Sequence, residues 1–300
     1  MAAPPDNDVL WARGLHYSYG GSPALQGVSL GVRAGEIVSV TGPRGSGKTT
    51  LLSCLSGQLT PHDGEIWFNS VPLHTLGRAA RERLRRDRFG WVGSEPQLVP
   101  ELTAWENAAL PLLLCGIGHR AARKTAREWL DRLDVGECAR KRPAALLQSE
   151  RQRVAIARAL APAPAILFAD EPTAPLHQLE RAQVLRTLTT AARSHDITVV
   201  LTTHDAAVSR PTMPPADPHA TDGTTEADAA DAAGTMLADR VLTLVDGRLN
   251  GLVATGPGDA RGGGEDDGDG GGDGPGGAGD DDSDGSDGSD SKGAACSLSV

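Results

Sequence analysis

The feature that most constrains the fold is a short apolar run followed by a glycine-rich loop and a helical segment. Residues Glu36–Val40 read Glu-Ile-Val-Ser-Val, which is typical of a buried strand. The next residues, Gly42–Thr49, fit the pattern Gly-x-x-x-x-Gly-Lys-[Ser/Thr] completely. Apolar residues then recur at helical spacing, and Gly57 can cap the end of that helix. A strand, a glycine loop and a helix in this order predict an α/β fold with a phosphate-binding loop.

Each part of this loop has a chemical reason for its position. The glycines let successive backbone N–H groups point inward and cradle the β- and γ-phosphates of a nucleotide. Lys48 adds a positive charge, the Thr49 hydroxyl suits Mg²⁺, and the following helix directs its positive dipole end at the phosphates. The residues that we predict to bind the nucleotide are Gly42, Pro43, Arg44, Gly45, Ser46, Gly47, Lys48, Thr49 and Thr50.

Two later strand-like runs end in polar side chains that suit the same chemistry. The apolar run Ala165–Ala169 leads directly into Asp170 and Glu171. Asp170 stands where a second Mg²⁺ contact is needed, and Glu171 can polarise the water that attacks the γ-phosphate. The β-rich run Ile197–Thr203 ends in His204. The alternative readings are a solvated turn for the acidic pair and an ordinary loop residue for the histidine.

These segments, in this order and spacing, resemble the ATP-binding subunit of ABC transporters. The resemblance rests on the phosphate loop, the Arg-Gln-Arg-Val-Ala-Ile-Ala-Arg-Ala-Leu run of Arg151–Leu160, and the Asp-Glu-Pro-Thr and Thr-Thr-His-Asp segments. It covers about Leu10–Val253, apart from an insertion. The family's activity implies ATP and Mg²⁺ as ligands, a permease as partner, and a second ATP-binding subunit.

The resemblance also implies individual roles. Thr49 and Asp170 would bind Mg²⁺, Glu171 would be catalytic, and His204 would bind the γ-phosphate and hold the attacking water in line. An aromatic residue near the start of such chains stacks on adenine.

Tyr19 falls at the place of that aromatic residue, with Tyr17 as a nearby alternative. Residues Glu101–Gly116 are most similar to the macrolide-export and lipoprotein-release branch of the family, whose permeases have few membrane helices and large extracellular domains.

The fold that follows is an α/β P-loop NTPase core with a mainly parallel sheet. We expect an antiparallel β-subdomain from the first 40 residues and Gly64–Phe68, and a helical signature subdomain across about Leu102–Ala161. Residues Val241–Val253 read as two short strands joined by Asp246-Gly247, a favoured hairpin turn. The expected domains are an N-terminal tail at 1–8, the ATP-binding domain at 9–256 with a disordered insertion at about 210–234, and a disordered tail at 257–300.

Composition separates that last tail from the rest of the chain. Residues Pro257–Val300 hold 12 acidic and 2 basic residues, so their net charge of −10 equals that of the whole chain. Their Gly/Asp/Ser-rich sequence has almost nothing apolar to bury, which predicts disorder. No apolar run is long enough to span a bilayer, and the resemblance implies a cytoplasmic protein that reaches the plasma membrane through its permease. The cysteines show no metal-ligand spacing and are expected to be reduced thiols: Cys54, Cys115, Cys138 and Cys296.

The chain departs from the family in the signature segment. In the family's head-to-tail dimer, each ATP lies between one phosphate loop and the partner's Leu-Ser-Gly-Gly-Gln. Here the segment reads Leu146, Leu147, Gln148, Ser149 and Glu150. Leu147 has no side-chain donor, the side chains at the two glycine positions restrict positive φ, and Glu150 adds a carboxylate that would repel polyphosphate.

Two further elements depart from the pattern. Ser94 stands where the family's Q-loop glutamine contacts Mg²⁺ and couples to the permease, and Gln97 lies three residues further on. In the D-loop, His177 replaces an aspartate, and Pro175 fixes φ and removes an N–H. Among the residues that serve the chain's own ATP, Tyr19, the phosphate loop, Asp170, Glu171 and His204 are thus intact. The signature and the D-loop, which serve a partner, are altered, and the Q-loop is altered too.

This split predicts an ATP-hydrolysing subunit of an asymmetric transporter, slow alone and paired with a second subunit that has a complete signature. A heterodimer is favoured over a homodimer. The alternative is a non-hydrolysing regulatory subunit in which ATP binding carries the signal. A small-molecule P-loop kinase is disfavoured because nothing resembles a lid or an acceptor site. The basic run Arg78–Arg88 predicts a solvated helix, and one helix is too little for a nucleic-acid role.

Overall fold

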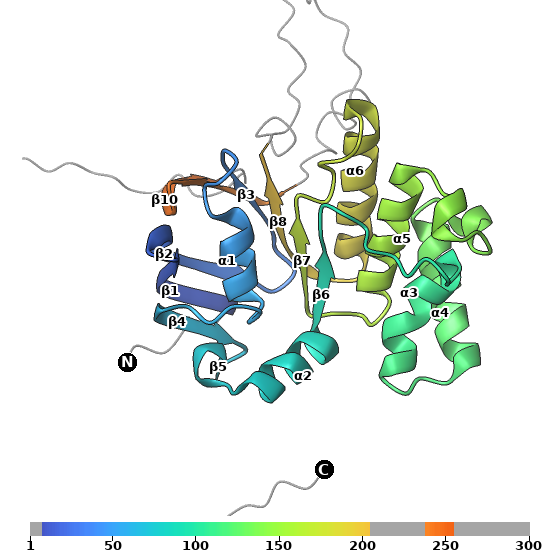
Figure 1. The fold of residues 1–300 in the computed structure, drawn as a ribbon, viewed down its shortest axis with the longest axis horizontal. Helices are drawn as coiled ribbons and strands as arrows, with labels where there is room; N and C mark the ends of the chain where they lie inside the picture. The colour runs from blue at the N-terminus through green and yellow to red at the C-terminus, as the bar shows by residue number, and fades with distance from the viewer. Residues whose placement is uncertain (1–7, 205–237, 255–300) are drawn as a thin grey trace, which may run out of the picture. The chain divides into compact units, whose positions relative to one another are not determined.

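The computed structural model describes residues 8–204 and 238–254 of the chain (Figure 1). Residues 1–7, the predicted insertion at 210–234, the predicted tail at 257–300 and Cys296 lie outside the described residues. The described strands form two sheets, one antiparallel and one mainly parallel. The predicted α/β class is confirmed, with both the antiparallel β-subdomain and the helical subdomain present.

The antiparallel sheet has the strand order β2-β1-β4-β5. Its first two strands in the chain, β1 and β2, are joined by a turn at Gly20 and Gly21, both with positive φ. Each of these two strands buries three apolar residues, and register shifts along the pair interrupt a strict alternation: Leu10, Ala12 and Leu15 in β1, and Leu25, Val28 and Val32 in β2. The bounds are β1, Asp8–Tyr19; β2, Ser22–Arg33; β4, Asp63–Phe68; and β5, Val71–Pro72.

The second sheet has the order β10-β9-β3-β8-β7-β6, in which β10 alone of the described strands runs antiparallel to its neighbour. Because β3 and β7 are both flanked by parallel strands, the loops at their carboxyl ends meet at one edge of the sheet. The bounds are β3, Ile37–Thr41; β6, Phe89–Val92; β7, Ile166–Asp170; β8, Thr198–Thr203; β9, Arg240–Val245; and β10, Arg248–Ala254.

The parallel sheet separates two apolar cores. Along β7, Phe168 packs into the core that holds the antiparallel sheet and helix α1, Lys48–Leu55. The neighbouring residues Leu167 and Ala169 pack into a second core, shared with the helices within residues 104–194. Since successive side chains of a strand point to opposite faces, a fully apolar run such as Ile166–Ala169 suits a strand that is covered on both sides.

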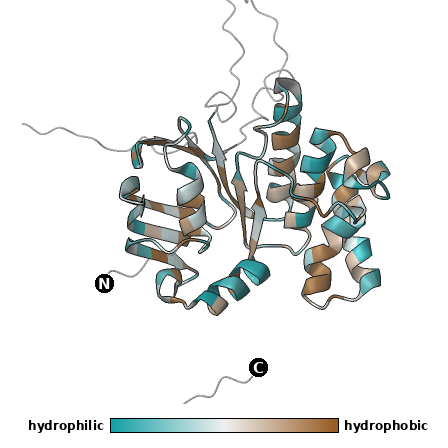
Figure 2. Ribbon diagram, in the orientation of Figure 1, coloured by the Kyte–Doolittle hydropathy of each residue, from teal (hydrophilic) through white to brown (hydrophobic). Residues whose placement is uncertain are grey.

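Helix α1 follows the glycine loop and contacts both sheets. Helices α3, α4 and α5 form a group that is inserted between β6 and β7, as the predicted helical subdomain requires (Figure 1). The hydrophilic α2 has no buried residue, which confirms the predicted solvated helix (Figure 2). The bounds are α1, Lys48–Leu55; α2, Arg78–Arg88; α3, Ala104–Leu114; α4, His119–Arg132; α5, Gln148–Leu160; and α6, Gln178–Ser194; single 3₁₀ turns cover Leu73–Thr75, Gly136–Cys138 and Pro143–Ala145.

The predicted hairpin closes the parallel sheet. Asp246 and Gly247 join β9 to β10 with φ of 47° and 73°, the pair of positive values that a type I′ turn needs. The Gly247 N–H also donates to the Ser46 carbonyl at 3.0 Å, so the hairpin is anchored on the glycine loop. In the part of the chain that the structure describes, none of the helices has the length and apolar character needed to cross a membrane.

The close packing of the hairpin on the loop gives a stability prediction. A Cβ at Gly247 would lie 2.7 Å from the Ala24 carbonyl oxygen, whereas one at Gly116, also at positive φ, would meet nothing within 4 Å. Both Gly→Ala changes introduce left-handed strain of about 1–2 kcal/mol. Only Gly247→Ala adds overpacking, so it should lower the free energy of unfolding by roughly 1–3 kcal/mol more than Gly116→Ala. Urea unfolding of both variants measures this difference, and equal losses would contradict it.

Candidate functional site

A cavity of about 610 Å³ lies where the carboxyl ends of β3 and β7 meet. Residues from the two sheets, from α1 and from the loop after β7 line it together. This is the edge of an open α/β sheet at which ligands bind. The lining residues are Tyr19, Ser22, Pro23, Ala24, Arg44, Gly45, Gly47, Lys48, Thr49, Thr50, Ser94, Asp170, Glu171 and Ala174.

The glycines of the loop are needed for its close packing. An added Cβ at Gly42 would clash with the Leu244 carbonyl oxygen, and one at Gly47, where φ is 102°, would clash with the Ala24 carbonyl oxygen. Gly45 has φ of 80° and open space beside it, so its glycine is required by backbone conformation alone. The loop is therefore held against both sheets and presents its backbone to the cavity.

The Lys48 ammonium group is buried at the centre of the site. Its Nζ donates to the carbonyl oxygens of Gly42 at 2.8 Å and Pro43 at 2.9 Å, and lies 3.3 Å from Glu171 Oε1. The side chain is only 4% exposed, so these three acceptors replace its lost hydration. One positive charge thereby joins the glycine loop to the acidic end of β7.

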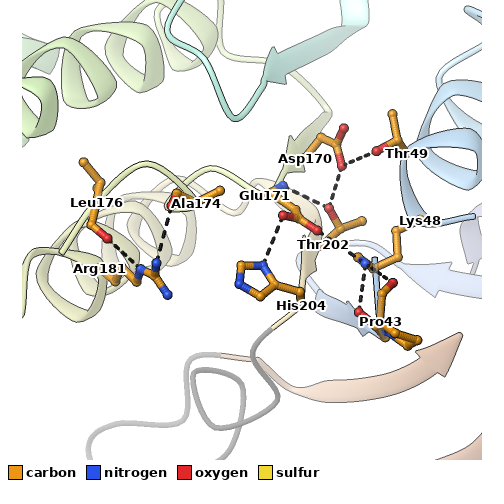
Figure 3. A network of polar contacts seen from close by, with 11 residues as sticks. Pro43, Lys48, Thr49, Asp170, Glu171, Ala174, Leu176, Arg181, Thr202 and His204 are labelled. Carbon is orange, nitrogen blue, oxygen red and sulfur yellow. Dashed lines mark hydrogen bonds and ion pairs between the residues drawn. The ribbon is translucent and has the colours of Figure 1, made fainter. Parts of the chain in front are cut away.

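Hydrogen bonds bring the predicted metal and catalytic residues together (Figure 3). Thr49 Oγ1 donates to Asp170 Oδ1 at 3.2 Å, across two elements far apart in the sequence. Glu171 Oε2 lies 3.1 Å from Nδ1 of His204, on the opposite side from its contact with Lys48. Glu171 has φ of 44°, an unusual value for a residue with a side chain. The carboxylate is thus held between an ammonium and an imidazole.

The residues at this site fit a nucleotide with Mg²⁺. Among residues 8–204 and 238–254, no group of three or more His, Cys, Asp or Glu side chains could hold a metal on its own. Mg²⁺ is commonly bound by only one or two protein oxygen ligands together with substrate phosphates and water. The adjoining Thr49 hydroxyl and Asp170 carboxylate match that set, and the buried Ser46 hydroxyl, which has no hydrogen-bond partner within the described residues, adds an unused polar group beneath the loop.

Tyr19 lies at the mouth of the cavity, and its side chain is 54% exposed. Its ring packs edge-to-face on Tyr17, which in turn stacks on His62 with ring centroids 4.7 Å apart. Tyr17 is half-buried and packs against the core of the antiparallel sheet. Of the two tyrosines, Tyr19 is therefore the one placed to offer an open ring face to a base.

The altered signature segment forms the start of α5. Leu147 precedes the helix with its side chain 68% exposed. Glu150, expected to repel polyphosphate, instead accepts hydrogen bonds from the Leu147 N–H at 2.7 Å and from the Cys138 thiol at 3.2 Å. The Leu147 hydrogen bond is the main reason that the pKa of Glu150 lies below its ordinary value. The carboxylate therefore serves its own helix.

The two other altered elements flank the cavity. Ser94 lines it, and also lines an adjoining cavity of about 220 Å³ together with Gln97 and Asp170. Helix α5 holds this segment, because Gln152 donates to the Gly93 carbonyl at 2.9 Å and Arg158 donates to the carbonyls of Pro96 and Gln97.

The D-loop segment leads into α6. His177 is exposed immediately before that helix, two residues after the exposed Pro175. Arg181 donates to the Leu176 carbonyl at 2.7 Å and shapes this turn from the helix side.

The sequence reasoning missed one residue at the centre of the network, Thr202 on β8. Its hydroxyl lies 2.7 Å from Asp170 Oδ1 and 2.9 Å from the Glu171 nitrogen. The available signal was a polar residue, Thr202, directly after the apolar run Val199–Leu201. A threonine is also a favoured strand residue, so the sequence alone gave no reason to single it out.

Comparisons with known proteins point in one direction. A family model described as ABC transporter matches residues 25–174. An uncharacterized ABC transporter ATP-binding protein of Mycobacterium tuberculosis is 44% identical over 194 residues, which cover 64% of this chain and 58% of that protein. The alignment thus spans less than two thirds of that relative. The lipoprotein-releasing system ATP-binding protein LolD of Koribacter versatilis is 38% identical over 62% of this chain and 83% of its own length.

A solved structure supports the same assignment. The ATP-binding cassette MJ0796, a dimer bound to ADP and Pi in a post-hydrolysis state, is similar with a TM-score of 0.67 and 30% sequence identity. The match covers 82% of this chain and 98% of the cassette.

The bonds of Glu150 predict a pH-dependent contribution to stability. Glu150→Ala should lower the free energy of unfolding by about 1 kcal/mol at pH 7, because the Leu147 N–H loses its acceptor. The pKa of Glu150 is lowered in the folded state, so its contribution is full above the unfolded value and lost as pH falls through the folded value. The difference between variant and wild type should therefore shrink below about pH 4.

Urea unfolding over a pH series measures this effect. Glu128→Ala is the matched control, because Glu128 is exposed and lies 3.8 Å from Lys124 on the surface of α4. The control should change stability by less than about 0.5 kcal/mol. A loss for Glu150→Ala that is equal at neutral and acidic pH would contradict the assigned bonds.

Proposed function

The chain belongs to the ATP-binding proteins of the ABC transporter family, and from this premise we propose that it binds Mg²⁺-ATP and hydrolyses it to drive transport through a separate membrane permease. The proposed ATP-binding domain spans 9–256. The observation that carries the proposal is the contact of Thr49 with Asp170, beside the contact of Lys48 with Glu171. A loop that binds phosphate, two oxygen ligands for Mg²⁺ and a positioned carboxylate therefore share one cavity.

The proposed chemistry uses each of these groups in a simple way. When bound, Mg²⁺ would neutralise charge that develops on the phosphates, with Thr49 and Asp170 as its protein contacts. The Lys48 ammonium can exchange its loop carbonyls for phosphate oxygens, because all three of its acceptors lie beside the cavity. Once Lys48 binds phosphate, the Glu171 carboxylate would be free to orient and deprotonate a water. His204 would still hold the Glu171 carboxylate from the other side.

We further propose that the chain works as one half of an asymmetric dimer. Leu147 presents an exposed apolar side chain where the family pattern has a serine that donates a hydrogen bond to the partner's ATP. Leucine cannot make that bond, while the glycine loop, Asp170 and Glu171 around the chain's own cavity match the family pattern. The MJ0796 cassette, which is similar in fold, is itself a dimer bound to ADP and Pi. A partner with a complete signature would therefore complete the hydrolytic site of this chain.

The proposed location is the cytoplasmic face of the plasma membrane, through a permease. The likeness to proteins named for lipoprotein release favours a permease of the macrolide-export and lipoprotein-release kind. The alternative is a regulatory subunit that binds ATP without hydrolysing it, which the altered signature would also suit. The two differ in whether the Glu171 carboxylate has any effect on turnover.

Two substitutions in the cavity separate nucleotide binding from hydrolysis. Lys48→Ala should reduce ATP affinity at least about 10-fold, because phosphate oxygens lose a charge-assisted partner. Glu171→Gln should leave ATP affinity within about 3-fold but lower the rate of hydrolysis about 100-fold or more. Fluorescence titration with a trinitrophenyl derivative of ATP and phosphate release measure the two effects. Glu128→Gln, on the exposed face of α4, is the control and should change neither. An unchanged hydrolysis rate in Glu171→Gln would favour the regulatory alternative.

The altered signature predicts that the chain needs a complementary partner for fast hydrolysis. The chain alone should bind ATP but hydrolyse it slowly, and Leu147→Ser with Gln148→Gly and Ser149→Gly should raise its turnover about 10-fold or more by rebuilding a closing surface. Phosphate release per subunit, followed over a series of protein concentrations, measures the change. Fast, cooperative hydrolysis by the wild-type chain alone would exclude the need for a complementary partner.

A further inference from the structure

Thr202 connects the two carboxylate positions of the site through one hydroxyl group. It lies on β8 directly beside Asp170 of β7 in the parallel ladder, and its side chain is completely buried. Its Oγ1 is 2.7 Å from Asp170 Oδ1 and 2.9 Å from the Glu171 nitrogen (Figure 3). A buried hydroxyl with both a donor and an acceptor in reach has no free rotation.

The direction of both hydrogen bonds follows from the chemistry of the groups. The Glu171 N–H can only donate, so the Thr202 oxygen accepts from it. The single hydroxyl proton is then left for Asp170, whose carboxylate can only accept while it is ionised. Each of the three groups is satisfied in one arrangement, which fixes them relative to one another.

This arrangement determines which carboxylate oxygen of Asp170 is available to bind a water or a cation. The hydrogen bonds from Thr49 and Thr202 both fall on Oδ1. Within the described residues, no protein donor is assigned to Oδ2, so it stays open for a water or a cation. The same hydroxyl, together with the Thr202 carbonyl at 3.2 Å, accepts from the N–H of Glu171, a residue held at the unusual φ of 44°.

We propose that Thr202 is a positioning residue that sets the Asp170 carboxylate for Mg²⁺ and the Glu171 backbone for hydrolysis at the same time. This inference rests on the proposed binding of Mg²⁺-nucleotide. Partners that orient a metal-binding carboxylate typically change metal affinity by 10–100-fold when they are removed. Removal of the hydroxyl should therefore weaken metal binding, while metal-free nucleotide binding, which depends on the glycine loop, stays unchanged.

The test compares three variants of the full chain. Thr202→Val keeps the shape and removes the hydroxyl, Thr202→Ser keeps the hydroxyl, and Thr198→Val is the matched control. Thr198 is equally buried on the same strand, and its hydroxyl accepts from the Gly35 N–H at 3.0 Å, away from the cavity. The readouts are Mn²⁺ affinity in the presence of ADP, by electron paramagnetic resonance of free Mn²⁺, and affinity for trinitrophenyl-ATP in EDTA, by fluorescence.

Thr202→Val should lower Mn²⁺ affinity roughly 10-fold or more, with unchanged affinity for the nucleotide in EDTA. Thr202→Ser should stay within about 3-fold of wild type, and Thr198→Val should match wild type in both readouts. Unchanged Mn²⁺ affinity in Thr202→Val, or an equal loss in Thr198→Val, would overturn the inference. If Thr202→Val does not fold, Thr202→Cys, with its weak thiol donor and acceptor, tests the same expectation.

The two proposals fail in distinguishable ways. A wild-type chain that binds no nucleotide in either condition would overturn the proposed function and this inference with it. A wild-type chain with Mn²⁺-dependent nucleotide binding that Thr202→Val shares in full would overturn only the role of Thr202.

Discussion

The burial of the Lys48 ammonium is the constraint on which the rest of the site depends. A charge that is removed from water must be surrounded by acceptors, and here two loop carbonyls and the Glu171 carboxylate supply them. The loop that provides the carbonyls can pack this closely against both sheets only because Gly42 and Gly47 have no side chain. The parallel sheet brings β7 within reach of the loop. Fold, loop sequence and charge therefore depend on one another, and the same contacts are those that a polyphosphate would replace.

Much of this architecture could be predicted from the sequence. Uniformly apolar runs identify strands covered on both faces, and parallel strands necessarily bring their carboxyl ends together. The polar residues that follow those runs, such as Asp170 and His204, were therefore expected near the loop. The hairpin at Asp246-Gly247 could be predicted equally well, because few residue pairs adopt its two positive φ values.

The direction in which individual side chains point could not be predicted from the sequence in this way. Glu150 sits where the family pattern faces a partner's nucleotide, yet its carboxylate turns back to the Leu147 N–H and the Cys138 thiol. Thr202 differs from an apolar strand residue only by a hydroxyl, whose importance depends on what lies across the ladder. In both cases the direction of the side chain depends on a competition between local and distant hydrogen bonds. Residue type and spacing do not determine which of these bonds forms.

The bond of Glu150 also changes how the altered signature is understood. The residue before α5, Leu147, has its N–H paired with the Glu150 carboxylate, and the buried Cys138 thiol donates to the same group. The same helix holds the segment around Ser94 through Gln152 and Arg158. Helix α5 therefore remains a rigid connection between the cavity's flank and the surface at Leu147. In the asymmetric dimer that we propose, the exposed apolar side chain of Leu147 would face the partner's nucleotide from this anchored helix, which suits a site that closes around nucleotide without promoting its hydrolysis.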